Sequence, residues 1–294
     1  MMITTTLADV VEKVQASILH VRGVHGIETA LAFRDGLILT TAHAISETIT
    51  ISNLDGKDLE VELVGIDPRL DLAVFTTDST LQSLPVAKKT RVGDVVLTIG
   101  SDGAKGPRIS WGLVSAIGDD WLTPKGAKVE HWIDVDASLP WGSSGGALVN
   151  TQGELIGLNT HGVIRGGTTL SVETLDKAIS KIQESGSVVP GWLGVKVHEA
   201  DLPKSQCEEL GQEKGMLILR VWGAAKKGGL QIGDILVGVD DGPISSYLSF
   251  KSELSGSGGQ EKKIKFLRSG EVHEQVILID EKKTKRRKWF AKCR

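Results

Sequence analysis

Short apolar runs that alternate with polar residues dominate residues 17–170 and restrict what this part of the chain can fold into. The clearest runs each precede a turn-forming residue: 30–33 before Asp35-Gly36, 49–51 before Asp55-Gly56, and 95–99 before Gly100. Alternation with a period of two is typical of strands with one buried face, and Gly and Asp are frequent in the turns between strands. This part of the chain therefore predicts an antiparallel β barrel or sandwich.

A helix is predicted where this pattern ends. Apolar residues recur at helical spacing from Val172 to Ile182, Ser171 is suited to cap the N-terminus, and the helix should end near Gly186. The small residues of 185–190 then indicate a linker, so a domain boundary is expected there.

The chain after this linker is again rich in predicted strands. A hairpin is predicted around Ser269-Gly270, between the runs 264–267 and 272–279, and a short helix is predicted at 248–254. A chain of 294 residues is long enough for two cores, at roughly 100 to 200 residues per domain.

The charge of the chain is unevenly distributed. Residues 281–294 hold eight Lys or Arg and one Glu, a formal charge of +7, so that the net charge of −3 leaves −10 on residues 1–280. Such a tail can bind acidic surfaces or nucleic acid, but a solvated terminus is the simpler interpretation, and we assign it no function.

The sequence shows no sign of a membrane span, a secretory signal or a cysteine metal site. No uninterrupted apolar run reaches about 18 residues, which excludes a membrane-spanning helix. Residues 1–14 lack the basic start and apolar centre of a secretory signal, so a signal either was removed or did not exist. Cys207 and Cys293 lie too far apart for metal-ligand spacing and indicate no redox compartment.

The sharpest local motif is the glycine-serine loop of residues 142–146. Small residues leave the Oγ of Ser144 exposed, and Gly142 allows a turn in which its own N–H and that of Ser144 converge on one point. Two converging N–H groups beside a nucleophile form an oxyanion hole. Taken alone, such a loop is more often a plain turn.

A nucleophilic serine needs a base, and the base needs a carboxylate to orient it. His43 follows a strand-like run at 37–39 and stands among small residues. Asp71 is embedded in apolar residues, where a carboxylate needs a partner such as a histidine N–H. Singly, His43 can be a core histidine and Asp71 a turn cap, but together with Ser144 they predict a catalytic triad.

The spacing of residues 142–146 also fits the nucleophile elbow of α/β-hydrolases. An elbow leads into a helix, whereas residues 147–157 indicate a strand, a Gln152-Gly153 turn and a second strand. The order His43, Asp71, Ser144 is that of chymotrypsin rather than of the hydrolases. The elbow interpretation therefore fails.

Several motifs together resemble the HtrA/Deg branch of trypsin-like serine proteases. They follow the order of that family at similar spacings: Leu39-Thr40-Thr41-Ala42-His43, Asp71-Leu72-Ala73-Val74, Arg91-Val92-Gly93-Asp94, Asp136-Ala137, 142–146 and Gly157-Leu158-Asn159-Thr160. The second unit is similar to a PDZ domain, through a carboxylate-binding loop at 191–195 and a Gly-Leu-x-x-Gly-Asp motif at 229–234. The resemblance covers about residues 8–280.

The resemblance implies an all-β protein with two domains. A chymotrypsin-like double β-barrel protease domain would span 1–187, a β-rich PDZ domain with short helices would span 188–280, and 281–294 would form a basic tail.

The resemblance also implies the roles of individual residues in peptide hydrolysis. Ser144 would be the nucleophile, His43 the general base and then acid, and Asp71 the orienting carboxylate. The N–H groups of Gly142 and Ser144 would be the oxyanion donors. No metal or other cofactor is expected.

In the PDZ domain, the backbone N–H groups of Trp192, Leu193, Gly194 and Val195 would hold the C-terminal carboxylate of a peptide. The competing interpretation is that Gly191 and Gly194 only bracket a tight turn.

Partners and location follow from the same resemblance. The protein would bind unfolded polypeptides and peptide C-termini, and it would act in protein quality control and stress response. It would form a homotrimer or a larger oligomer, and no nucleic acid is expected as a partner. The location would be the periplasm or cell envelope, although the lack of a signal segment leaves the cytoplasm open.

The chain departs from the family pattern at several positions. Ser143 replaces the usual Asn before the nucleophile, Glu28-Thr29-Ala30 replaces Gly-Ser-Gly, and residues 1–6 replace an aromatic segment that forms trimers. Of the properties that the resemblance implies, the oligomeric assembly is therefore the one that it supports least. His161 and Arg165, which the family would place beside the substrate, are interpreted as a polar hairpin tip.

Substrate preference depends on the residue six positions before the nucleophile. In trypsin-like enzymes an acid there selects Lys or Arg, whereas this chain has Ser138, followed by Leu139 and Pro140. An uncharged, aliphatic side chain should therefore be preferred.

One function from another class competes with the protease. The chain can instead be a chaperone or a PDZ scaffold with an idle or switched-off protease site. The complete set of triad residues argues against this alternative.

Overall fold

The computed structural model describes residues 2–281 except 24–25, 46–48, 102, 104–105 and 165, without the side chains of 2–6 and 185. Arg165 and the basic tail from residue 282 therefore lie outside the described residues. The chain divides into two compact units. The first comprises the chain up to Thr123 together with Lys128–Val188, and the second comprises Pro124–Ala127 and the chain from Val189 onward.

The first sheet of unit 1 has six antiparallel strands. In spatial order they are β4 (Thr50–Ser52), β1 (Ile18–Gly23), β2 (Gly26–Ala32), β3 (Leu37–Thr41), β6 (Leu72–Thr76) and β5 (Glu62–Asp67). Strands β3 and β6 are neighbours inside this sheet, and all of their residues except Thr76 are buried. This pattern of neighbouring antiparallel strands places the ends of β3 and β6 side by side.

The second sheet of unit 1 closes into a barrel. Its strands, in spatial order, are β11 (Ile133–Val135), β14 (Thr168–Ser171), β13 (Leu155–Thr160), β12 (Ala147–Asn150), β7 (Val95–Ser101) and β8 (Pro107–Ile117). A small hairpin of β9 (Trp121–Leu122) and β10 (Lys128–Val129) accompanies it. The predicted antiparallel β barrel is confirmed.

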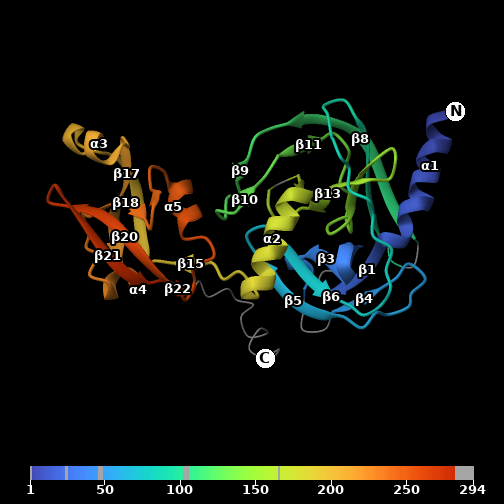
Figure 1. Cartoon of the computed structure of the whole chain (residues 1–294), viewed down its shortest axis with the longest axis horizontal. Helices are drawn as coiled ribbons and strands as arrows, with labels where there is room; N and C mark the ends of the chain where they lie inside the picture. Colours follow the sequence, from blue (N-terminus) through green and yellow to red (C-terminus); the bar gives the residue numbers. More distant parts are fainter. Residues whose placement is uncertain are drawn as a thin grey trace. The chain divides into compact units, whose positions relative to one another are not determined.

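Two α-helices and three 3₁₀ turns complete unit 1: α1 (Met2–Val14), α2 (Val172–Ser185), η1 (Gln15–Ser17), η2 (Arg34–Gly36) and η3 (Ala42–Ala44). Helix α2 was predicted, and Ser171 caps it by accepting a hydrogen bond from the Thr174 N–H at 3.2 Å. It ends at Gly186, whose φ is 73°, and it packs against β5 and β13 (Figure 1). Helix α1 was not predicted.

Unit 2 is built on a mixed-length antiparallel sheet. Its strands are β16 (Val195–Asp201), β17 (Lys214–Val221), β18 (Ile235–Val239), β20 (Glu261–Arg268) and β21 (Glu271–Leu278), with β19 (Gly242–Pro243) beside β18. A separate pair joins β15 (Gly191–Trp192) to β22 (Asp280–Glu281). The helices are α3 (Lys204–Leu210), α4 (Gly223–Lys227) and α5 (Tyr247–Glu253).

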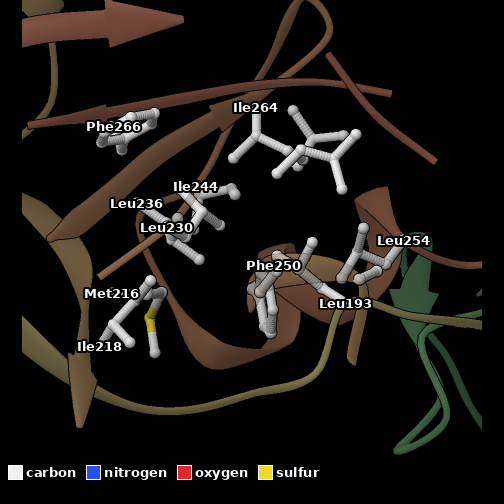
Figure 2. Packing of buried hydrophobic residues seen from close by; sticks show 14 of the residues in the cluster. Leu193, Met216, Ile218, Leu230, Leu236, Ile244, Phe250, Leu254, Ile264 and Phe266 are labelled. Atoms are coloured by element: carbon white, nitrogen blue, oxygen red, sulfur yellow. The ribbon is translucent and has the colours of Figure 1, made fainter. Parts of the chain in front are cut away.

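Unit 2 has a hydrophobic core of its own. Figure 2 shows labelled members of this cluster, in which Leu193, Phe250 and Leu254 pack with residues of the sheet. The predicted hairpin is present between β20 and β21, with positive φ at both Ser269 and Gly270, as a type I′ turn requires.

Candidate active site

His43 and Asp71 lie at the adjoining ends of two neighbouring strands. His43 is in η3, directly after β3, and Asp71 directly precedes β6; in the register of these strands Thr41 is opposite Leu72. His43 Nδ1 is 2.6 Å from Asp71 Oδ2, and the His43 backbone N–H donates to Asp71 Oδ1 at 2.9 Å. The sheet therefore fixes His43 and Asp71 in contact with each other.

The second barrel also holds Asp71. Thr160, the last residue of β13, donates its hydroxyl to Asp71 Oδ2 at 2.6 Å. The next residue but one is Gly162, where an added Cβ would lie 2.0 Å from the same oxygen, so only glycine fits. Asp71 itself is buried and has a φ of 57°, a conformation that is uncommon for a non-glycine residue. Its carboxylate is thus fixed from both sheets of unit 1.

Ser144 lies in the loop that leads into β12, and this loop is pressed against the first sheet. The Thr29 N–H of β2 donates to the Ser144 carbonyl at 3.1 Å, and the Thr29 hydroxyl donates to the Gly142 carbonyl at 2.5 Å. An added Cβ at Gly145 would lie 2.0 Å from the Thr29 carbonyl. Gly142 and Gly145 both have positive φ, 86° and 85°, so the glycines of this loop are required by its path.

The predicted oxyanion donors are the N–H groups of Gly142 and Ser144. Among the described residues, no hydrogen bond engages either N–H group. Both donors are therefore free of competing protein acceptors in that part of the chain.

Ser144 Oγ meets a histidine that the sequence analysis did not assign to the site. His161 Nδ1 lies 2.9 Å from Ser144 Oγ, and the His161 backbone N–H lies 3.3 Å from the same oxygen. His161 Nε2 is 3.0 Å from the Leu139 carbonyl. His161 lies in the connection between β13 and β14, as the hairpin-tip interpretation has it, but its side chain also contacts Ser144. Its position directly after Thr160 was the available signal.

Glu28 is a second residue of the site that the sequence analysis did not assign. Its Oε1 is 3.7 Å from His43 Nε2, and its side chain is 7% exposed. Sequence analysis noted Glu28 only as a departure from the family pattern, because the alternation of β2 does not reveal which residue of a neighbouring loop its side chain faces.

The two carboxylates determine the charge of His43. Burial lowers the pKa of His43, whereas Asp71 and then Glu28 raise it, and the net result is a pKa of about 9 instead of 6.5. Both carboxylates therefore favour the protonated form of the His43 ring.

The predicted carboxylate-binding loop of unit 2 runs from Trp192 to Val195. Trp192 ends β15, and Val195 begins β16, which lies at the edge of its sheet. Gly194 has a φ of 84°, and an added Cβ there would lie 2.2 Å from the Trp222 carbonyl. Leu193 is 1% exposed and belongs to the core of unit 2.

The described part of the chain shows neither a metal centre nor a membrane-spanning helix. No cluster of His, Cys, Asp and Glu is placed to hold a metal ion there. Among the helices of those residues, none is both long and apolar enough to cross a membrane.

Comparison with known proteins gives consistent matches. The model of the trypsin-like peptidase domain matches residues 29–158. The serine endoprotease DegS of Escherichia coli is 31% identical over 264 residues, which cover 84% of this chain and 71% of DegS. A probable periplasmic serine protease do/HhoA-like of Haemophilus influenzae is 32% identical over 259 residues, 83% of this chain and 55% of that protein. The chain spans about half the length of the curated relatives it matches first.

Solved structures agree in fold over nearly the whole chain. The HtrA-type protease AlgW with decapeptide has a TM-score of 0.69 at 26% identity, covering 94% of this chain and 99% of that one. The serine endoprotease from Yersinia pestis has a TM-score of 0.70 at 28% identity, covering 94% of this chain and 98% of that one.

Proposed function

Because the chain belongs to the HtrA/Deg family of trypsin-like serine proteases, we propose that it is an endopeptidase that hydrolyses unfolded proteins through Ser144, His43 and Asp71. The observation that carries this proposal is the 2.6 Å contact between His43 Nδ1 and Asp71 Oδ2. A carboxylate bound to Nδ1 fixes the tautomer that leaves Nε2 to act as the base.

The reaction would pass through an acyl-enzyme. Neutral His43 takes the proton of Ser144 as Oγ attacks the peptide carbonyl, and the N–H groups of Gly142 and Ser144 stabilise the oxyanion. His43 then gives its proton to the leaving amine, and water hydrolyses the acyl-enzyme in the reverse sequence. For this step the Ser144 hydroxyl must leave its present contact with His161 Nδ1, which lies 2.9 Å from Oγ.

His161 is the alternative candidate for the base, because its Nδ1 lies 2.9 Å from Ser144 Oγ. His161 has the Leu139 carbonyl at its other nitrogen, whereas His43 has the Asp71 carboxylate. A carboxylate stabilises the imidazolium that forms during proton transfer, and a neutral carbonyl does so far less. This favours His43 as the base.

The proposal is tested by the Ser144→Ala variant. The substitution removes one oxygen and no packed volume, so proteolysis of unfolded casein should fall by about 10⁴- to 10⁶-fold while the circular dichroism spectrum is unchanged. A variant that still cleaves casein at more than a trace would show that Ser144 is not the nucleophile.

A fluorophosphonate probe separates the protease from the alternative of a chaperone or scaffold with an idle site. Labelling that is lost in Ser144→Ala shows a competent nucleophile. Absence of labelling from about pH 5 to pH 10, with and without added peptides, supports the binding protein instead.

The second unit is proposed to be a PDZ domain, over 188–280, that binds peptide C-termini. Support comes from the edge strand β16 and the loop of Trp192, Leu193, Gly194 and Val195 in front of it. A peptide would add as a strand beside β16, with its carboxylate on the N–H groups of the loop. The buried position of Leu193 suits the wall of a pocket for the terminal apolar side chain.

Specificity, assembly and location are also proposed for this chain. Ser138 Oγ pairs with Ser110 Oγ at 2.9 Å, which supports a preference for uncharged over basic side chains before the scissile bond. A homotrimer or larger oligomer rests on the family resemblance alone. A periplasmic or envelope location rests on relatives that are named as periplasmic, among them those of Haemophilus influenzae and Pseudomonas putida.

A further inference from the structure

Glu28 is a buried carboxylate in an environment that offers it few partners. Its side chain is 7% exposed, and among the described residues its Oε2 has no hydrogen-bond partner. Burying an ionised carboxylate is unfavourable unless a cation or several donors compensate for the lost water. The His43 ring supplies such a cation when it is protonated, because His43 Nε2 lies 3.7 Å from Glu28 Oε1.

The backbone fixes this contact close to the nucleophile. Glu28 is paired with Val21 of β1, and the next residue, Thr29, is bonded through its N–H to the Ser144 carbonyl at 3.1 Å. The Thr29 carbonyl in turn accepts the Thr40 hydroxyl at 2.7 Å. The backbone of Glu28 therefore belongs to the strand that supports the Ser144 loop.

The proton of Ser144 is also engaged elsewhere. The Leu139 carbonyl can only accept a hydrogen bond, so the His161 Nε2 that contacts it at 3.0 Å must carry the hydrogen. In a neutral ring Nδ1 is then an acceptor, and the Ser144 hydroxyl donates to it at 2.9 Å. Within the part of the chain that the structure describes, both hydrogen bonds of Ser144 Oγ go to His161.

We propose that Glu28 is a positioning residue of this protease site. From the Nε2 side it holds His43 as an imidazolium while the Ser144 proton is held by His161, so the nucleophile becomes active only after His43 loses its proton. The inference rests on the proposed function. It adds that Glu28, a residue outside the proposed triad, controls the protonation of His43.

The charges around His43 support this inference. The carboxylates that act on His43 are Asp71, from the start of β6, and Glu28, from β2; from the second barrel His161 faces Ser144. Asp71 is bonded to Nδ1 and is needed in the active form as well. Glu28 lies at Nε2, the nitrogen that must accept the Ser144 proton, and therefore competes with the reaction. The raised pKa of His43, about 9, agrees with a ring between two carboxylates.

The test is the pH dependence of Ser144 labelling by a fluorophosphonate in Glu28→Gln, which keeps the shape of the side chain and removes its charge. The midpoint should move to lower pH, and the labelling rate at pH 7 should rise about tenfold for each unit by which the pKa of His43 falls. Glu28→Asp should restore part of the shift. The matched control is Glu130→Gln, a buried glutamate of the same unit that pairs with Lys177, and its profile should equal that of the wild type.

His161→Ala separates the two contacts. Freed from His161, Ser144 should be labelled faster at every pH, with no change in the midpoint set by His43. An unmoved midpoint in Glu28→Gln, or loss of labelling in a folded His161→Ala variant, would overturn the proposal; the second result would make His161 the partner that activates Ser144.

A measurement without catalysis keeps this result distinct from the proposed function. In the Ser144→Ala background, the titration of His43 is followed by NMR with and without Glu28→Gln. A His43 pKa well above 6.5 that falls in Glu28→Gln supports the proposed effect of Glu28 on His43. If this result is obtained but no variant is ever labelled, only the protease proposal fails. An ordinary His43 titration in both proteins would overturn the proposed effect.

Discussion

At the scale of single residues, His43 contacts two carboxylates, one at each nitrogen of its ring. Its Nδ1 contact with Asp71 orients it, and its Nε2 contact with Glu28 favours the proton that the reaction must remove. Both contacts stabilise the folded chain, but only the first one serves the proposed chemistry. Stability and activity therefore depend on the protonation of His43 in opposite directions.

This opposition gives a prediction for stability. The folded pKa of His43 is about 9 against 6.5, so between these values the folded state binds the proton more tightly than the unfolded state does. The contribution is fully present below pH 6.5 and is lost as the pH rises through about 9. Urea unfolding should therefore show a free energy of unfolding that falls over this window, and the fall should be smaller in His43→Gln. Equal slopes in both proteins would contradict the pKa shift.

Local motifs and their order led to the proposed triad of His43, Asp71 and Ser144, but they did not assign Glu28 or His161 to the site. His43, Asp71 and Ser144 stand in local motifs whose chemistry is recognisable in sequence. The contacts of Glu28 and His161 join different sheets or loops, and a side chain's direction across such a gap depends on strand pairing and twist that the sequence does not display.

At the scale of elements, the sequence predicted the helix that local interactions stabilise and missed the one that tertiary packing stabilises. Helix α2 has an apolar stripe, a capping serine and a terminal glycine, and it was predicted within about one residue at each end. Helix α1 has three successive threonines in its first turns, and β-branched residues lower helix propensity. It is held by burial of Val10 and Val14, a tertiary effect that a sequence window does not contain.

Helix α2 gives a prediction at this scale. The Ser171 hydroxyl caps the helix at Thr174 and also donates to the Glu130 carbonyl at 2.6 Å, both in a buried setting. Ser171→Ala should lower the free energy of unfolding by about 1 to 2 kcal/mol, measured by chemical denaturation. Ser180→Ala, an exposed position within the same helix, is the control and should change stability by less than about 0.5 kcal/mol. Equal effects would show that the cap contributes nothing.

At the scale of the whole molecule, two compact units, the second with a hydrophobic core of its own, allow the two proposed activities to be assayed separately. Unit 1 contains His43, Asp71 and Ser144, and unit 2 contains the loop of residues 192–195 and the edge strand β16. A change confined to the triad should therefore leave peptide binding by unit 2 intact.

Peptide binding gives the prediction at this scale. The full-length Ser144→Ala protein should bind, at micromolar affinity, a fluorescent peptide that ends in an apolar residue with a free carboxylate. Amidation of that terminus should weaken binding by about 1.5 to 3 kcal/mol, because charged hydrogen bonds to the loop are lost. Fluorescence anisotropy measures both. Equal affinity for acid and amide would show that the loop is not a carboxylate site.

The hydroxyl of Thr160 that supports Asp71, and the N–H of Thr29 that supports the Ser144 loop, each cross from one sheet of unit 1 to the other. During synthesis His43 and Asp71 emerge first, and Ser144 and Thr160 follow only with the second barrel. On the proposed function, neither barrel alone can hold an aligned nucleophile, so a half-made chain is harmless to its neighbours and to itself. If the chain is the protease proposed above, these crossed supports would keep a partly synthesised chain from cutting proteins.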